Sequence, residues 1–144
     1  MHFMKPKTPN ICLSHTLRRA DRVVSQIYNE YFAPLGLRVT QFTILRTLAI
    51  TGTITAKQIR DALVMDQTTV SRALKPLIRD GYITVGEGAN KREKALSLSE
   101  EGKTLYRQAL GPWNEAQKML RKKLGKSQED TLIALSREIV AMKG

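Results

Sequence analysis

The sequence predicts a mainly α-helical fold that carries one small β-hairpin. Over most of the chain, apolar residues recur every three or four positions, which is the spacing of amphipathic helices. Two short segments, 82–85 and 95–98, alternate apolar and polar residues instead, as paired strands do. A tight two-residue link, Val64-Met65, separates two of the helical patterns. The length of 144 residues suits a single domain, 1–144.

The outer helices follow from their apolar periodicity and their ends. A first helix is predicted over 11–32, before the Ala33-Pro34 exit. Thr40 stands where it would cap a second helix, which runs to about Ile50. Ser99, followed by two glutamates, predicts the start of a long helix, and a last helix is predicted from Ser127.

The middle of the chain, 38–99, predicts a winged helix-turn-helix lobe. Thr55 and Gln58 form a capping box that opens a short helix. Asp66 is placed to cap the next helix, 66–80, and Gly81 follows it as a left-handed stop. The order of helix, tight turn, helix and hairpin is that of a fold whose second helix enters the DNA major groove. The inward residues are expected to be Val70, Leu74, Leu77 and Ile78 on the helix and Ile83, Val85, Leu96 and Leu98 on the hairpin.

The opposite face of helix 66–80 has the chemistry needed for reading DNA. Its side chains are short and polar or basic, and segment 67–75 contains no acidic residue. Groove reading needs hydrogen-bonding groups that let the helix approach the bases, and Arg72 suits a bidentate contact with guanine. An ordinary solvated helix face is the alternative interpretation. The predicted DNA-binding residues of this helix are Gln67, Thr68, Thr69, Ser71, Arg72 and Lys75.

The hairpin loop, 86–94, is predicted to be a DNA-binding wing. It carries Lys91, Arg92 and Lys94, and glycines allow it to follow a phosphate backbone into the minor groove. An ordinary charged hairpin tip is the alternative. We favour the wing because the loop follows the predicted helix pair.

The charge balance favours a polyanionic partner. The chain has 24 Lys and Arg against 13 Asp and Glu, a formal charge of +11. Both nucleic acid and an anionic membrane surface would attract such a protein, but no apolar run is long enough to span a bilayer. The sequence has only two histidines and one cysteine, and it contains no phosphate-binding loop and no zinc-ligand spacing. We therefore expect no enzymatic activity, no bound metal and no cofactor. A soluble cytoplasmic protein is expected, and a non-specific architectural nucleic-acid binder is the alternative function.

Two stretches resemble the MarR family of bacterial regulators. Segment 35–45, LGLRVTQFTIL, is similar to the family's entry into its second helix, and segment 66–77, DQTTVSRALKPL, is similar to its recognition helix. The family's wing pattern, Asp-x-Arg-Asp-x-Arg, is replaced here by Ala-Asn-Lys-Arg-Glu-Lys over 89–94. Lysine keeps the charge of arginine but not its bidentate geometry.

The resemblance implies a homodimer, most often a repressor, that binds a palindromic operator. Segments 11–33 and 100–143 would pack against the partner, and two recognition helices would reach successive major grooves. These segments also offer more apolar helix surface than one small lobe can cover.

The release signal has two candidates in the first helix. Cys12 lies at the helix start near His15 and Arg19, where the helix dipole and basic neighbours favour a thiolate. Family members that sense organic hydroperoxides carry a reactive cysteine in a similar place, which implies an oxidation switch. A buried, unreactive thiol is the alternative. His15 and Arg19, four residues apart, are instead candidate contacts for a small aromatic or anionic ligand.

Overall fold

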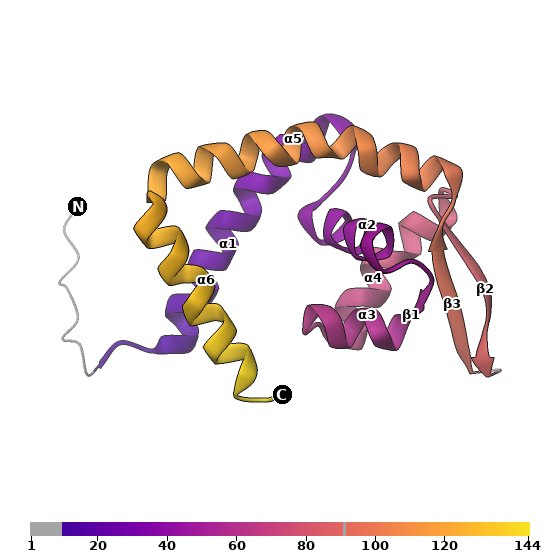
Figure 1. Cartoon of the computed structure of the whole chain (residues 1–144), viewed down its shortest axis with the longest axis horizontal. Coiled ribbons are helices and arrows are strands. Elements are labelled where there is room, and N and C mark those ends of the chain that lie inside the picture. Colours follow the sequence, from indigo (N-terminus) through magenta and orange to yellow (C-terminus); the bar gives the residue numbers. More distant parts are fainter. Residues whose placement is uncertain (1–9, 91) are drawn as a thin grey trace.

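A computed structural model describes residues 10–90 and 92–144 as six α-helices, one 3-10 turn and three strands (Figure 1). The mainly helical fold with a hairpin wing is confirmed. The elements are α1 (Leu13–Phe32), η2 (Ala33–Leu35), α2 (Val39–Thr51), β1 (Ile54–Thr55), α3 (Ala56–Leu63), α4 (Gln67–Arg79), β2 (Ile83–Asn90), β3 (Glu93–Leu98), α5 (Glu100–Leu124) and α6 (Lys126–Ala141).

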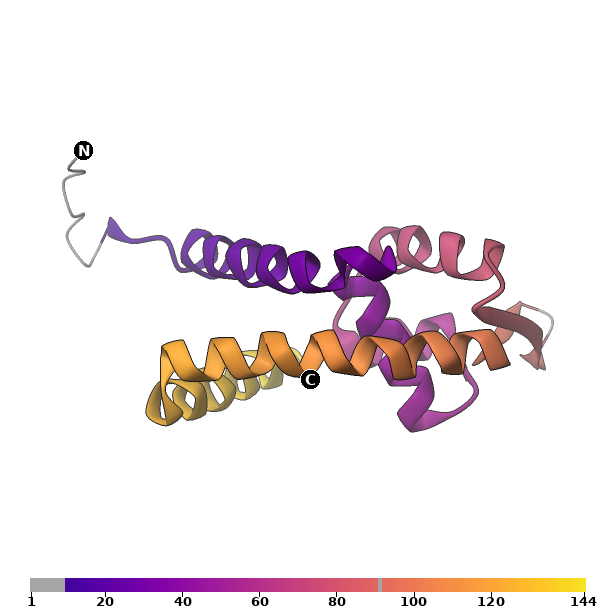
Figure 2. The same ribbon diagram turned by 90° about the horizontal axis from the view of Figure 1, so that it is seen from above.

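Helix α5 runs along most of the length of the molecule (Figures 1 and 2). Near its first half lie α2, α3, α4 and the sheet, which together form the winged lobe. Its second half carries α1 and α6, and the chain turns sharply between α5 and α6 at Gly125. One continuous helix therefore connects the lobe with the helical end.

The hydrophobic core lies in the lobe and against the first half of α5. Helix α1 contributes only its last residue, Phe32, to the buried set, and α6 contributes none. The apolar stripe of the helical end therefore remains exposed. The core cluster consists of Phe32, Leu37, Phe42, Ile44, Leu45, Leu48, Ile59, Val70, Leu74, Leu77, Ile83, Leu96, Leu105 and Ala109.

The wing is an antiparallel hairpin with a third short strand added. The strand order is β1-β3-β2, and Leu96 of β3 lies opposite both Ile54 and Val85. The predicted hairpin is confirmed, whereas β1 was not predicted. Two residues expected to point inward do not: Val85 is 46% exposed and Ile78 is 36% exposed.

The cap of α2 differs from the prediction. Arg38, not Thr40, is the N-cap, so Thr40 already lies inside the helix. The backbone N–H of Val39 donates to Oδ1 of Asn29 on α1 at 2.7 Å, and the N–H of Arg38 donates to Oε1 of Gln41 at 3.0 Å. These partners take up two backbone N–H groups at the start of α2.

Candidate nucleic-acid interface

Two capped helices joined by a tight turn form the centre of the interface. The Thr55 hydroxyl accepts the N–H of Gln58 at 3.1 Å, and the Gln58 side chain accepts the N–H of Thr55 at 2.9 Å, which confirms the capping box. After α3, Val64 adopts a left-handed conformation, with φ 53° and ψ 48°. This conformation reverses the chain within two residues, so α4 begins directly beside α3.

Asp66 caps the recognition helix α4, as predicted. One carboxylate oxygen accepts the backbone N–H of Thr69 at 2.7 Å, and the other accepts the Thr69 hydroxyl at 3.1 Å. These hydrogen bonds favour the charged form, so they hold the pKa of Asp66 below its usual value. The Asp66 carboxylate is therefore engaged by the first turn of α4.

The exposed side of α4 carries all six predicted residues. Val70, Leu74 and Leu77 are buried, and the helical period then places Thr68, Arg72 and Lys75 on the line opposite the core. Gln67, Thr69 and Ser71 are also exposed, on the flanks of that line. The structure brings these side chains to one surface, which has a polar and basic character.

Arg79 extends this line by one turn and was not predicted. Its guanidinium donates to both carboxylate oxygens of Asp80, at 3.0 Å and 3.2 Å. This bidentate pair neutralises a cation at the end of α4 that would otherwise add to the basic surface.

A hollow between α3 and α4 adds a second unpredicted residue, Arg60. The α3–α4 hollow has a volume of about 380 Å³. Arg60 is half-buried on α3 and faces this space together with residues of the reading helix. One signal pointed to it: the first helix of a helix-turn-helix lies across the DNA backbone, so its basic residues are candidate contacts. The hollow is lined by Ala56, Arg60, Gln67, Val70, Ser71, Leu74, Lys75 and Ile78.

The wing places two of its three predicted cations on the surface. Arg92 and Lys94 are exposed at the end of the hairpin, where the strand register shifts between Glu87 and Asn90. Lys94 lies opposite Glu87 in the ladder. Lys91 lies outside the described residues. The wing therefore carries acidic as well as basic groups close to its tip.

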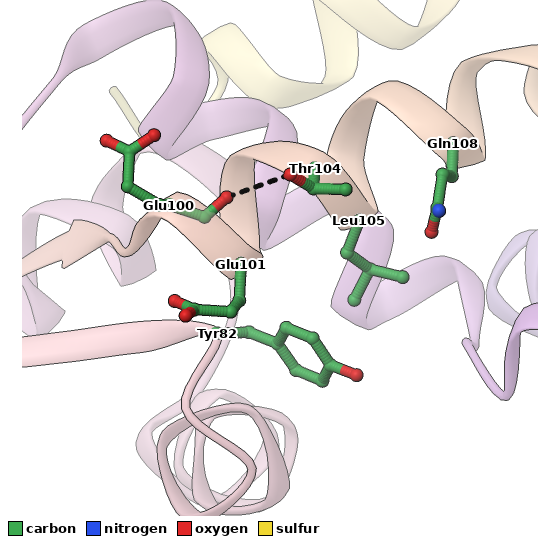
Figure 3. A pocket seen from close by; sticks show the side chains of 6 residues that line it. All are labelled: Tyr82, Glu100, Glu101, Thr104, Leu105 and Gln108. Carbon is green, nitrogen blue, oxygen red and sulfur yellow. Dashed lines mark hydrogen bonds between the residues drawn. The ribbon is translucent and has the colours of Figure 1, made fainter.

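The end of α4 is latched to the start of α5. Ser99, the N-cap of α5, donates its hydroxyl to the carbonyl of Gly81 at 2.5 Å and its N–H to the carbonyl of Tyr82 at 3.1 Å. Gly102 packs so closely that a Cβ there would lie 2.0 Å from the Tyr82 oxygen. A pocket of about 350 Å³ lies beside this latch, with the Tyr82 ring below Leu105 (Figure 3). The latch fixes the recognition helix to the long helix.

The predicted switch residues lie on one exposed stretch of α1. Cys12 is the N-cap residue, and its thiol is exposed in the single chain. Its carbonyl accepts the hydroxyl of Thr16 at 2.9 Å. His15 and Arg19 are exposed as well.

A more enclosed space exists between α2, β3 and α5. This α2–α5 hollow has a volume of about 470 Å³ and is lined by Lys103, Tyr106 and Arg107 together with apolar residues of α2 and β3. Beside it, the Arg46 guanidinium lies 4.6 Å from the centroid of the Trp113 ring and donates to the Tyr106 hydroxyl at 3.3 Å. The hollow therefore combines cations, a phenol and an apolar floor.

An apolar groove lies between α1 and α6 at the other end of the molecule. This α1–α6 groove has a volume of about 400 Å³. The apolar helix residues that line it are of a kind that a folded chain normally covers, and no described residue of this chain covers them. Its apolar lining consists of Leu17, Ala20, Val24, Leu132, Leu135, Ile139 and Val140.

These features together define a winged helix DNA-binding protein, and comparisons with known proteins identify the family. A model of the MarR family matches residues 35–93. An uncharacterized HTH-type transcriptional regulator of Bacillus subtilis, YwoH, is 32% identical over 94 residues, which cover 65% of this chain and 69% of that protein. The chain belongs to the MarR family of transcriptional regulators, which are non-enzymatic DNA-binding proteins.

Solved structures share the fold over nearly the whole chain. The transcriptional regulator MOSR of M. tuberculosis, in complex with DNA, is 26% identical, with a TM-score of 0.79 over 93% of this chain and 100% of its own. BpsR of Bordetella bronchiseptica, whose DNA binding is regulated by 6-hydroxynicotinic acid, is 20% identical, with a TM-score of 0.80 over 94% of this chain and 98% of its own. Among the described residues, no helix is both long and apolar enough to cross a membrane.

Proposed function

We propose that this protein is a homodimeric repressor that binds a palindromic operator in duplex DNA. The observation that carries the proposal is the line of Thr68, Arg72 and Lys75 on α4, exposed opposite the buried core. Arg72 is the residue for a bidentate base contact, and the neighbouring hydroxyls supply shorter hydrogen bonds. Arg92 and Lys94, with Lys91, would contact the backbone beside the minor groove.

The α1–α6 groove supports the homodimer. Apolar helix surface of this kind is costly to leave in water, and α6 buries none of its residues within the chain. A second copy, packed through segments 11–33 and 100–143, would cover it and set two recognition helices about one turn of DNA apart. The winged lobe, 38–99, then acts as the DNA-reading part of each protomer.

Release from DNA follows one of two routes. A small aromatic anion would fit the α2–α5 hollow, where Lys103 and Arg107 supply charge, better than the exposed pair His15 and Arg19. The regulation of BpsR by an aromatic acid makes this ligand class a reasonable one to test. Oxidation of the exposed Cys12 is the second route. Calorimetric titration with aromatic acids tests the first, and silence across the panel counts against it.

The decisive experiment is selection of bound genomic fragments, followed by competition between the selected site and random duplex. A specific reader prefers the selected site and footprints it symmetrically, whereas equal affinities would favour a non-specific architectural protein. Arg72→Ala should cost about 1–3 kcal/mol on the selected site with little loss on random duplex. An equal loss on both would assign Arg72 to a phosphate instead.

A further inference from the structure

The α3–α4 hollow has two chemically different parts. Its floor is apolar and consists of Ala56 from α3 with Val70, Leu74 and Ile78 from α4. Its rim is polar and carries two cations from different helices, Arg60 and Lys75, with Gln67 and Ser71 beside them. None of the described residues that line it is acidic. Asp61, the neighbour of Arg60, lies within 3.9 Å of Lys57 instead. The hollow is thus a basic rim around an apolar floor.

The hollow also divides the exposed residues of α4 into two groups. Thr68 and Arg72 lie on the line opposite the core, where a helix in the major groove meets the bases. Lys75 lies on the same line and also borders the hollow. Gln67 and Ser71 lie on the flank that faces α3. In a helix-turn-helix, the DNA strand that borders the groove runs across the first helix. That strand would therefore pass over the flank and the hollow.

We infer that the α3–α4 hollow is a subsite for one nucleotide of the DNA backbone, with its phosphate between Arg60 and Lys75 and its deoxyribose over the apolar floor. This inference rests on the proposed function. The two cations would neutralise the charge of one phosphate. The sugar would cover apolar surface, including the exposed part of Ile78. Arg60 is then a positioning residue, and Gln67, Ser71 and Lys75 hold the backbone while Thr68 and Arg72 read bases.

Salt dependence of binding tests the role of Arg60. Arg60→Ala should lower affinity for the selected site and for random duplex by the same factor, about fivefold per bound lobe near 0.15 M salt. The negative slope of log K against log salt should become shallower by about 0.9 per lobe. Arg60→Gln keeps most of the side-chain stem and should lose as much affinity as Arg60→Ala. Equal losses in the two variants show that the missing charge, and not a folding defect, causes the effect. A loss confined to the selected site would overturn the inference, as would no loss.

A methylphosphonate scan of the operator locates the contact. Replacing one phosphate per half-site with the neutral methylphosphonate should weaken the wild-type complex more than the Arg60→Ala complex, in which that phosphate has only its Lys75 contact left to lose. Lys57→Ala, an exposed cation on the same helix outside the hollow, is the matched control and should remain sensitive at that position. Additive losses at every position in Arg60→Ala would refute the subsite. Random duplex binding reports on Arg60 even if no operator exists, so the two proposals fail separately.

Discussion

Substituting Gly102 by alanine should destabilise the protein through a single backbone contact. The added Cβ would lie 2.0 Å from the Tyr82 carbonyl oxygen and 3.3 Å from Cδ2 of Leu98. A backbone oxygen cannot rotate away, so the segment after α4 must move or the first turn of α5 must open. Overpacking of this kind costs about 3 kcal/mol, of which alanine's better helix propensity recovers about 1 kcal/mol. The net loss of about 2 kcal/mol should lower Tm by roughly 8 °C.

The same helix supplies the matched control, Gly111→Ala. Apart from its chain neighbours and the backbone of its own helix, no atom of the described residues lies within 4 Å of a Cβ at Gly111, and the residue is exposed. This substitution should therefore stabilise the protein by about 1 kcal/mol and raise Tm by roughly 4 °C. Thermal denaturation at one fixed protein concentration measures both changes, because dimerisation would make Tm depend on concentration. If both variants were stabilised alike, the contact between α5 and Tyr82 would not constrain the fold.

Three further outcomes are expected. Asp66→Ala should lower Tm at neutral pH, where the charged carboxylate stabilises the folded state. The difference in Tm from the wild type should shrink as pH falls through the depressed pKa of Asp66, because the protonated carboxyl no longer gives that stabilisation. A constant difference across the acid range would contradict this. Val64→Asn should stabilise the protein against urea by about 1 kcal/mol, since a β-branched residue resists positive φ and this side chain is 69% exposed. Ile50→Asn, the control at a similarly exposed helical site, should not stabilise it. If oxidation releases DNA, hydroperoxide should dissociate the wild-type complex and spare Cys12→Ser in a gel-shift assay; release of the variant would exclude the thiol.

Structure that depends on neighbours in the chain could be predicted. Asp66 and Thr55 each accept a backbone N–H from a residue three positions later in the chain. Both helix caps could therefore be predicted from the local sequence. The prediction that Thr40 caps α2 was wrong because Asn29, a residue of another helix, accepts a backbone N–H in the first turn of α2. Strand β1 spans only two residues, too few for alternation to reveal.

The candidate site divides in the same way. The exposed face of α4 follows from a single helical period, so Arg72 and its neighbours could be found from spacing alone. Arg60 lines the same hollow as residues of α4 because of the angle at which α3 and α4 meet, and the helical period of either helix does not contain that angle. The demand for glycine at position 102 likewise comes from Tyr82, twenty residues earlier in the chain.

Helix α5 has a mechanical consequence for how DNA could be released. Its 25 residues form a rod of about 37 Å, latched at one end to the recognition helix through Ser99 and Gly102. A tilt of about 5° at the far end would carry the latched end through roughly 3 Å, which is close to the rise of one base pair. A small tilt of α5 would thus displace the latched end of α4 by about the length of one base-pair step.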